Sequence, residues 1–166
     1  MNLFLTVGTQ LPFDRLVQAL DAWAGMHCHE DLAIFGQIGP VSSDGYRPQN
    51  FACMSFLEPE EFDRRFADAT HIIAHAGMGT IISALVAEKP LLIMPRRARL
   101  GEQRNDHQLA TVRQFKHRPG IWAVEDETGL ASKLDRFLKP KKYPRRNAPE
   151  LAPATLTDAI RAEILA

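Results

Sequence analysis

The feature of this 166-residue sequence that most constrains its fold is the alternation of short apolar runs with amphipathic stretches. Buried parallel strands are continuous apolar runs, and each is followed by a helix that covers one face of the sheet. Strands are expected at 3–7, 32–35, 51–56, 71–75, 90–95 and 121–124, and helices from Pro12, from Pro59, and at 80–86, 105–115 and 128–138. We therefore predict an α/β fold, a Rossmann-like parallel sheet of about six strands with helices on both faces.

The last part of the chain differs in composition from the rest. Residues 139–153 contain four prolines and five basic residues, which favours an extended linker over a packed element. A short helix is expected after it, from about residue 155 to 165. We therefore expect one domain over residues 1–138, followed by a basic linker and a short C-terminal helix over 139–166.

The charge balance excludes a general attraction to polyanions. Twenty basic residues face twenty acidic ones, so binding to nucleic acid or to an anionic membrane is not encoded by net charge. Two local basic stretches exist: the four arginines Arg96, Arg97, Arg99 and Arg104, and the segment 139–146. A solvated loop and a solvated tail explain these stretches equally well, and no nucleic-acid partner is expected.

Cysteine usage and the first residues favour a cytoplasmic protein. Cys28 and Cys53 form neither a disulfide framework nor a CxxC pair. The apolar opening at 1–7 lacks a basic flank and is too short for a signal peptide or a membrane span. The chain is therefore expected to reach a membrane only through a partner or through its surface.

A metal site is not expected. The segment 27–30, His-Cys-His-Glu, offers side chains that bind metals. Consecutive residues cannot all face one ion, however, and no second ligand pair stands at a spacing typical of zinc sites. A surface loop explains this segment better.

A glycine turn follows the strand expected at 71–75. The sequence there is His75-Ala76-Gly77-Met78-Gly79-Thr80. In parallel sheets, ligands bind beyond the carboxyl ends of the strands, where the next helix offers free N–H groups and the positive end of its dipole. Gly77 and Gly79 are expected to allow positive φ angles and a close approach of phosphate to the backbone, and Thr80 could add a hydroxyl. Alternatively, the glycines serve only a tight turn, and Thr80 caps the helix.

Two other nucleotide-binding classes fit this turn less well. The dinucleotide-binding pattern GxGxxG would need a glycine where Ile82 stands, and it would occupy the first crossing from strand to helix. The phosphate-loop pattern GxxxxGK[ST] is absent from the sequence.

Two further segments are expected at the same edge of the sheet. Gly8 and Thr9 follow the first strand and precede a helix, although an ordinary turn explains them equally well. A polar run then follows the strand at 90–95. Mixed donors and acceptors of this kind suit sugar and ribose hydroxyls, and helix capping accounts only for Asn105 or Asp106. The candidate side chains in this run are Glu102, Gln103, Asn105, Asp106, His107 and Gln108.

Together, residues 6–9 and 12–16, the turn 75–80 and the segment 105–108 resemble the C-terminal domain of family-28-type glycosyltransferases, which have the GT-B fold. The likeness is greatest to the small split members: the PssE-type subunits of bacterial exopolysaccharide synthesis and the catalytic subunit of the dolichol-linked N-acetylglucosaminyltransferase. It covers about the first 140 residues, in order. This chain would supply one half of a GT-B fold.

The resemblance implies which groups hold the donor. The turn of His75, Gly77, Met78, Gly79 and Thr80 would hold the diphosphate of a UDP-sugar. The polar run at 102–108 would touch the sugar. In a single-chain peptidoglycan relative a glutamate holds the ribose hydroxyls, and Ser83 stands at that position here.

The resemblance also implies a partner, because a GT-B enzyme needs two facing domains. A membrane-anchored subunit would carry the acceptor-binding domain, and the acceptor would be a lipid-linked sugar or polysaccharide precursor. The complex would then work at the inner face of the membrane. An alternative is a non-catalytic subunit that binds the nucleotide sugar and tunes a partner enzyme.

For the reaction we expect inversion by direct displacement. Backbone N–H groups of residues 77–80, with His75 and Arg97, would stabilise the charge that gathers on the leaving β-phosphate. No cofactor and no divalent metal are then expected. Asp14, His107 or the partner chain would supply the general base.

Overall fold

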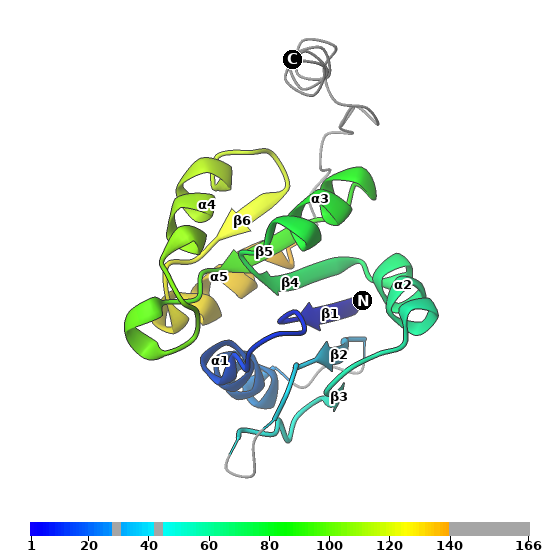
Figure 1. Cartoon of the computed structure of the whole chain (residues 1–166). Helices are drawn as coiled ribbons and strands as arrows, with labels where there is room; N and C mark the ends of the chain where they lie inside the picture. Colours follow the sequence, from blue (N-terminus) through cyan, green and yellow to red (C-terminus); the bar gives the residue numbers. More distant parts are fainter. Residues whose placement is uncertain (28–30, 42–44, 140–166) are drawn as a thin grey trace, which may run out of the picture.

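The computed structural model describes residues 1–27, 31–41 and 45–139. This part of the chain forms a parallel sheet of six strands in the order β3-β2-β1-β4-β5-β6 (Figure 1). The strands are β1 (Asn2–Thr6), β2 (Ala33–Gln37), β3 (Ala52–Met54), β4 (His71–His75), β5 (Leu91–Met94) and β6 (Ile121–Ala123). The predicted α/β class and parallel sheet are confirmed.

The helices follow the strands in the predicted alternation. They are α1 (Asp14–Met26), α2 (Pro59–Asp68), α3 (Met78–Val86), α4 (His107–Phe115) and α5 (Leu130–Phe137), with short 3-10 helices η1 (Ala98–Leu100) and η2 (Glu127–Gly129). The expected start of the third helix at Thr80 was wrong. Gly77 is its N-cap, so Gly79 and Thr80 lie within its first turn.

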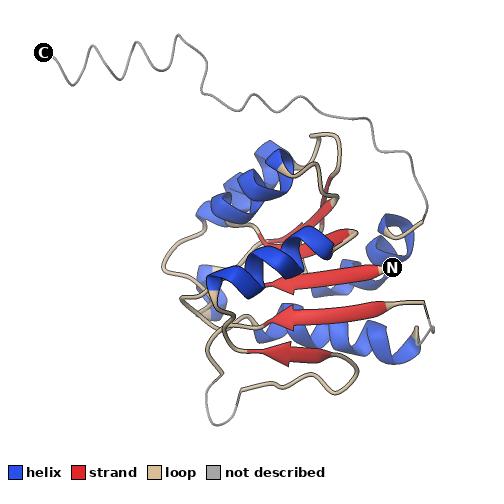
Figure 2. Ribbon diagram, turned by 90° about the vertical axis from the view of Figure 1, so that its right-hand side faces the viewer, coloured by secondary structure: helices blue, strands red, loops and turns tan. Residues whose placement is uncertain are grey.

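Helices cover both faces of the sheet, as Figure 2 shows with helices in front of and behind the strands. Successive strand residues point to opposite faces. Leu3, Leu5 and Leu92 therefore pack with α1 and α5 in one apolar cluster, whereas Phe4 and Ile93 pack with α2, α3 and α4 in the other. The two clusters hold the sheet between two helical layers.

The strand order places a ligand crevice between β1 and β4. From β1 the chain builds the sheet first toward β2 and β3, and then starts again on the other side at β4. In open parallel sheets, ligands bind at such a switch point, beyond the carboxyl ends of the two strands. The segments that meet there are the turn after Thr6 and the turn after His75.

Among the described residues, no helix has the length and apolar character needed to cross a membrane. The basic linker and final helix expected over 139–166 lie outside the described residues, except for Lys139. Of the metal-capable segment 27–30, only His27 is described.

Candidate functional site

A polar pocket of about 420 Å³ lies at the switch point, at the carboxyl edge of the sheet. It is bounded by the turn after β1, the turn between β4 and α3, and the segment that leads into α4. Its lining residues are Val7, Gly8, Thr9, Gln10, Leu11, His75, Gly77, Met78, Gly79, Arg96, Gln103, His107 and Gln108. The structure thus brings both predicted glycine turns and part of the predicted polar run together.

The imidazole of His75 packs between two glycines. A Cβ atom on Gly8 would lie 2.9 Å from His75 Cε1, and one on Gly77 would lie 2.2 Å from His75 Nε2. Gly8 also has a φ angle of 80°, which L-residues with a side chain rarely adopt. Any larger residue at either position would displace the ring.

The positive φ angles expected at Gly77 and Gly79 are not found. Gly77 has a φ of −90°, and Gly79 is helical. Contact explains these glycines instead: Gly77 leaves room for the His75 ring, and a Cβ on Gly79 would meet no atom within 4 Å. Because Gly79 lines the pocket, its missing side chain leaves space for a ligand.

The first turn of α3 offers an anion site. Its first intrahelical bond runs from Ile81 N–H to the Gly77 carbonyl, at 3.1 Å. The N–H groups of Met78, Gly79 and Thr80 therefore have no partner within the helix. These donors and the positive end of the helix dipole favour a bound phosphate.

His75 is neutral at physiological pH. Burial, with the nearby Arg96 guanidinium, lowers the pKa of His75 to about 4. The ring therefore carries no positive charge; one of its nitrogens bears a hydrogen and the other can accept one, and the Thr6 main chain is a hydrogen-bond partner of the ring.

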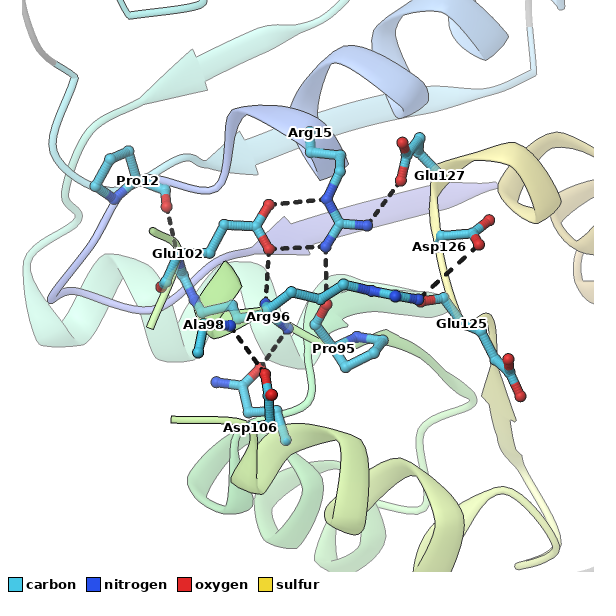
Figure 3. Close-up of polar contacts among 12 residues, drawn as sticks. Pro12, Arg15, Pro95, Arg96, Ala98, Glu102, Asp106, Glu125, Asp126 and Glu127 are labelled. Carbon is cyan, nitrogen blue, oxygen red and sulfur yellow. Dashed lines mark hydrogen bonds and ion pairs between the residues drawn. The ribbon is translucent and has the colours of Figure 1, made fainter. Parts of the chain in front are cut away.

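Arg96 is a site residue that the sequence did not single out. It lies two residues after the end of β5 and is only 2% exposed. Its guanidinium donates to the carbonyls of Val7 at 2.7 Å and Leu11 at 2.6 Å. It also donates to the carbonyl of Pro12, which Figure 3 shows. One interpretation of the basic stretch was a solvated loop. For Arg96 it is wrong, because this buried side chain holds the turn after β1 in place.

Glu102 holds the same region in place and does not line the pocket. It receives two hydrogen bonds from Arg15, of 2.8 and 2.7 Å, and one of 2.8 Å from the Arg97 main chain (Figure 3). These bonds, with one from Arg15 to Glu127, raise the pKa of Arg15 although burial opposes the rise. The ion pair ties α1 to the segment after β5.

The other predicted site residues divide into two groups. Thr9, Gln103 and His107 line the pocket, and so does Gln108, whose side chain is buried and accepts a 3.0 Å bond from Arg96 N–H. The residues outside the pocket lining are Asp14, Thr80, Ser83, Arg97, Glu102, Asn105 and Asp106.

Four of the residues outside the lining have contacts of their own. Asp14 accepts a 3.3 Å bond from the main chain of Tyr46. Arg97 donates to the Glu125 carbonyl at 2.9 Å. Asp106 accepts from Ala98 N–H at 2.9 Å, and Asn105 contacts the His107 ring.

The fold and the pocket define a Rossmann-like α/β domain with a polar pocket at its switch point. Residues 2–162 match the model of the glycosyltransferase family 28 C-terminal domain, and the chain belongs to this family. It is therefore a glycosyltransferase domain of the GT-B type.

Solved structures of similar fold include chains of which this chain covers less than half and one that it covers almost completely. MurG of Acinetobacter baumannii has a TM-score of 0.60 at 19% identity, with 82% of this chain and 41% of that chain covered. The kitacinnamycin glycosyltransferase has a TM-score of 0.58 at 14% identity, with 84% and 35% covered. The NMR structure of ALG13 has a TM-score of 0.59 at 18% identity, with 96% and 94% covered.

The chain thus spans about a third of the first glycosyltransferases that it matches, and nearly all of ALG13. A comparison with curated proteins finds no match. Within the part of the chain that is described, no group of three His, Cys, Asp or Glu side chains could hold a metal ion.

Proposed function

We propose that this chain is the donor-binding, catalytic subunit of a two-chain, UDP-sugar-dependent glycosyltransferase. The observation that carries the proposal is the polar pocket at the switch point, which His75, Arg96 and the first residues of α3 line. The acceptor would be a lipid-linked sugar or polysaccharide precursor, bound by a membrane-anchored second chain at the inner face of the membrane.

The pocket suits stabilisation of a leaving diphosphate. In an inverting displacement, the acceptor oxygen bonds to the anomeric carbon while the bond from that carbon to the β-phosphate oxygen breaks. The N–H groups of Met78 and Gly79, which line the pocket, would donate to the departing UDP beside the neutral His75 ring. Such preorganised donors stabilise developing charge without a metal.

The proton of the acceptor hydroxyl must pass to a base. Of the two side chains suggested by the sequence, His107 lies at the pocket, whereas Asp14 lies outside its lining. His107 is exposed, so its imidazole could meet an acceptor that enters from solvent. We propose His107 or a residue of the second chain as the base.

A second chain is supported by the extent of the match. The chain covers 94% of ALG13 and 41% of MurG, and its likeness in extent to ALG13 supports a donor domain that works with a second chain. The family's GT-B architecture requires a second domain opposite the pocket.

Binding and turnover can be tested separately. Calorimetric titration of the purified chain should show binding of UDP and a much weaker response to NAD. Transfer of radiolabelled sugar to a lipid-linked acceptor should then require this chain and its second chain together. Failure to bind UDP would remove the proposal.

The alternative is an accessory subunit that binds the nucleotide sugar without catalysing transfer. The accessory role is favoured by the position of Asp14 outside the pocket lining, because one of the two candidate bases is then lost. Transfer at an equal rate without this chain would support the accessory role and exclude the catalytic one.

A further inference from the structure

Helix α3 exposes an apolar surface. Its sequence, MGTIISALV, has no charged residue, and Ile81 and Ala84 pack under it in the core. On its outer side, Met78, Ile82 and Val86 are 45%, 52% and 61% exposed. A spacing of four residues places these three side chains along one line. Large apolar side chains that are exposed together on one line of a helix mark a contact surface.

The neighbouring helix on the same face carries positive charge. Helix α4 packs in the same apolar cluster as α3, and Figure 1 shows both helices on the side of β4 and β5 away from α1. Between residues 107 and 124 the sequence has no Asp or Glu. Arg113, Lys116 and Arg118 are exposed there, and no ion pair within the described segments involves them.

The helical layer formed by α2, α3 and α4 is positive at α4 and negative at α2. Helix α2 holds four acidic residues and two arginines, and Glu61 pairs with both arginines at 2.7 Å. An anionic surface would therefore be attracted at α4 and repelled at α2. The apolar line on α3 lies in the same layer and carries no charge.

We propose that the α3–α4 surface, formed by Met78, Ile82, Val86, Arg113, Lys116 and Arg118, docks on an anionic lipid bilayer. The aliphatic side chains would enter the boundary between headgroups and acyl chains, while the cations meet lipid phosphates. A surface with few contacts gives weak, salt-sensitive binding, which a membrane-anchored partner would reinforce. Because Met78 also lines the pocket, the donor site would lie at the bilayer, and this consequence rests on the proposed function.

Vesicle sedimentation of the full-length chain tests the proposal. The probe is vesicles of phosphatidylcholine and phosphatidylglycerol in equal amounts, compared with vesicles of phosphatidylcholine alone. We expect sedimentation with the anionic vesicles only, reduced by added salt. Ile82→Asp and Lys116→Glu should each lower the bound fraction, by about fivefold or more.

Matched controls lie on the opposite face of the sheet. Met26 on α1 is 71% exposed, and Arg136 on α5 is exposed as well. Met26→Asp and Arg136→Glu introduce the same chemical changes and should leave vesicle binding unchanged. Circular dichroism of each variant shows whether it is folded.

Several outcomes would overturn the proposal. The first is full-length protein that does not sediment with anionic vesicles. The second is vesicle binding by Ile82→Asp and Lys116→Glu that equals that of the wild type. The third is an equal loss of vesicle binding in the two control variants. Loss of binding to the second chain by Ile82→Asp, with vesicle binding intact, would make this surface a protein interface instead. UDP titration separates the two proposals: a chain that binds vesicles but not UDP retains the docking surface and loses the proposed function.

Discussion

The Arg96 guanidinium donates a 2.7 Å hydrogen bond to the main-chain carbonyl of Val7, and so joins the end of β5 to the turn after β1. The same group reaches Leu11 and Pro12 and lies 4.7 Å from the Phe13 ring centroid. Burial lowers the pKa of Arg96 to about 10, although Glu102 opposes this effect. The side chain therefore stays charged at neutral pH and fixes one wall of the pocket.

Replacing Arg96 should damage both stability and UDP binding. Arg96→Met leaves the buried Val7 carbonyl and the partly buried contacts of Leu11 and Pro12 without their donor, and an unsatisfied buried group costs about 1–3 kcal/mol. We expect the free energy of unfolding to fall by about 3 kcal/mol or more. Arg96→Lys keeps the charge but has one donor nitrogen, so it should unfold more easily than the wild type and bind UDP at least about tenfold more weakly.

Urea denaturation and calorimetric titration measure these two effects. Arg97→Met is the matched control, because Arg97 donates to the Glu125 carbonyl outside the pocket lining. Wild-type UDP affinity in a folded Arg96→Lys variant would show that the turn after β1 keeps its shape without the guanidinium.

The two glycines of the α3 turn should respond differently to substitution. Gly79→Val places a side chain where no protein atom lies within 4 Å, so the fold should persist while the phosphate approach is blocked. UDP affinity should drop by about tenfold or more, an effect of about 1.4 kcal/mol. In contrast, Gly77→Ala drives a methyl group into the His75 ring, and it should lower the free energy of unfolding as well.

Thermal unfolding and UDP titration of both variants separate blocked binding from lost packing. Equal UDP affinity in Gly79→Val and wild type would place the diphosphate elsewhere.

The fold could be predicted because its signals are local. Residues 3–7, 71–75 and 90–95 are continuous apolar runs, and the helices between them have one apolar face. The start of α3 was predicted two residues late because Gly79 has a low helix propensity. A glycine in the first turn of α3 nevertheless leaves the N–H groups and the positive end of the helix dipole available, because these belong to the backbone.

The pocket was predicted only in part because its walls come from distant segments. Gly8, His75 and Gly77 could be found from turns at strand ends. Arg96 and Arg97 are adjacent in a basic stretch, and the sequence does not show which one turns inward. The contacts that decide this join Arg96 to residues 84–89 positions away, so they exist only in the folded chain.

The low pKa of His75 should appear in the pH dependence of stability. The pKa of His75 is about 4 in the folded chain, against 6.5 as its ordinary value. Between these pH values the unfolded state binds the extra proton, so stability falls as pH decreases from 6.5 to 4 and is constant above that window. The difference amounts to at most about 3 kcal/mol.

His75→Asn should weaken this dependence. Urea unfolding of both proteins across the window measures it, and the difference between them isolates His75 from His71, whose pKa is also lowered by burial. Parallel stability curves for wild type and His75→Asn would show that His75 titrates normally.

The ion pair between Arg15 and Glu102 should stabilise the fold and affect UDP binding only indirectly, because it holds the segment after β5 in position. Both side chains are mostly buried, and their closest nitrogen and oxygen atoms are 2.7 Å apart. Glu102→Gln leaves the mostly buried Arg15 with the half-exposed Glu127 as its remaining counter-charge, so it should lower the free energy of unfolding by about 1–3 kcal/mol. Because Glu102 does not line the pocket, its effect on UDP affinity should be smaller than that of Arg96→Lys.

A double-mutant cycle of Arg15→Met and Glu102→Gln measures the pair directly. We expect a coupling free energy of about 1–3 kcal/mol in urea unfolding. Arg15 also pairs with Glu127 at 2.7 Å, so Glu127→Gln serves as the control; its side chain is 43% exposed, and its coupling should be about 1 kcal/mol or less. A Glu102→Gln variant with wild-type stability and strongly reduced affinity for the UDP-sugar, but not for UDP, would instead restore Glu102 as a sugar contact.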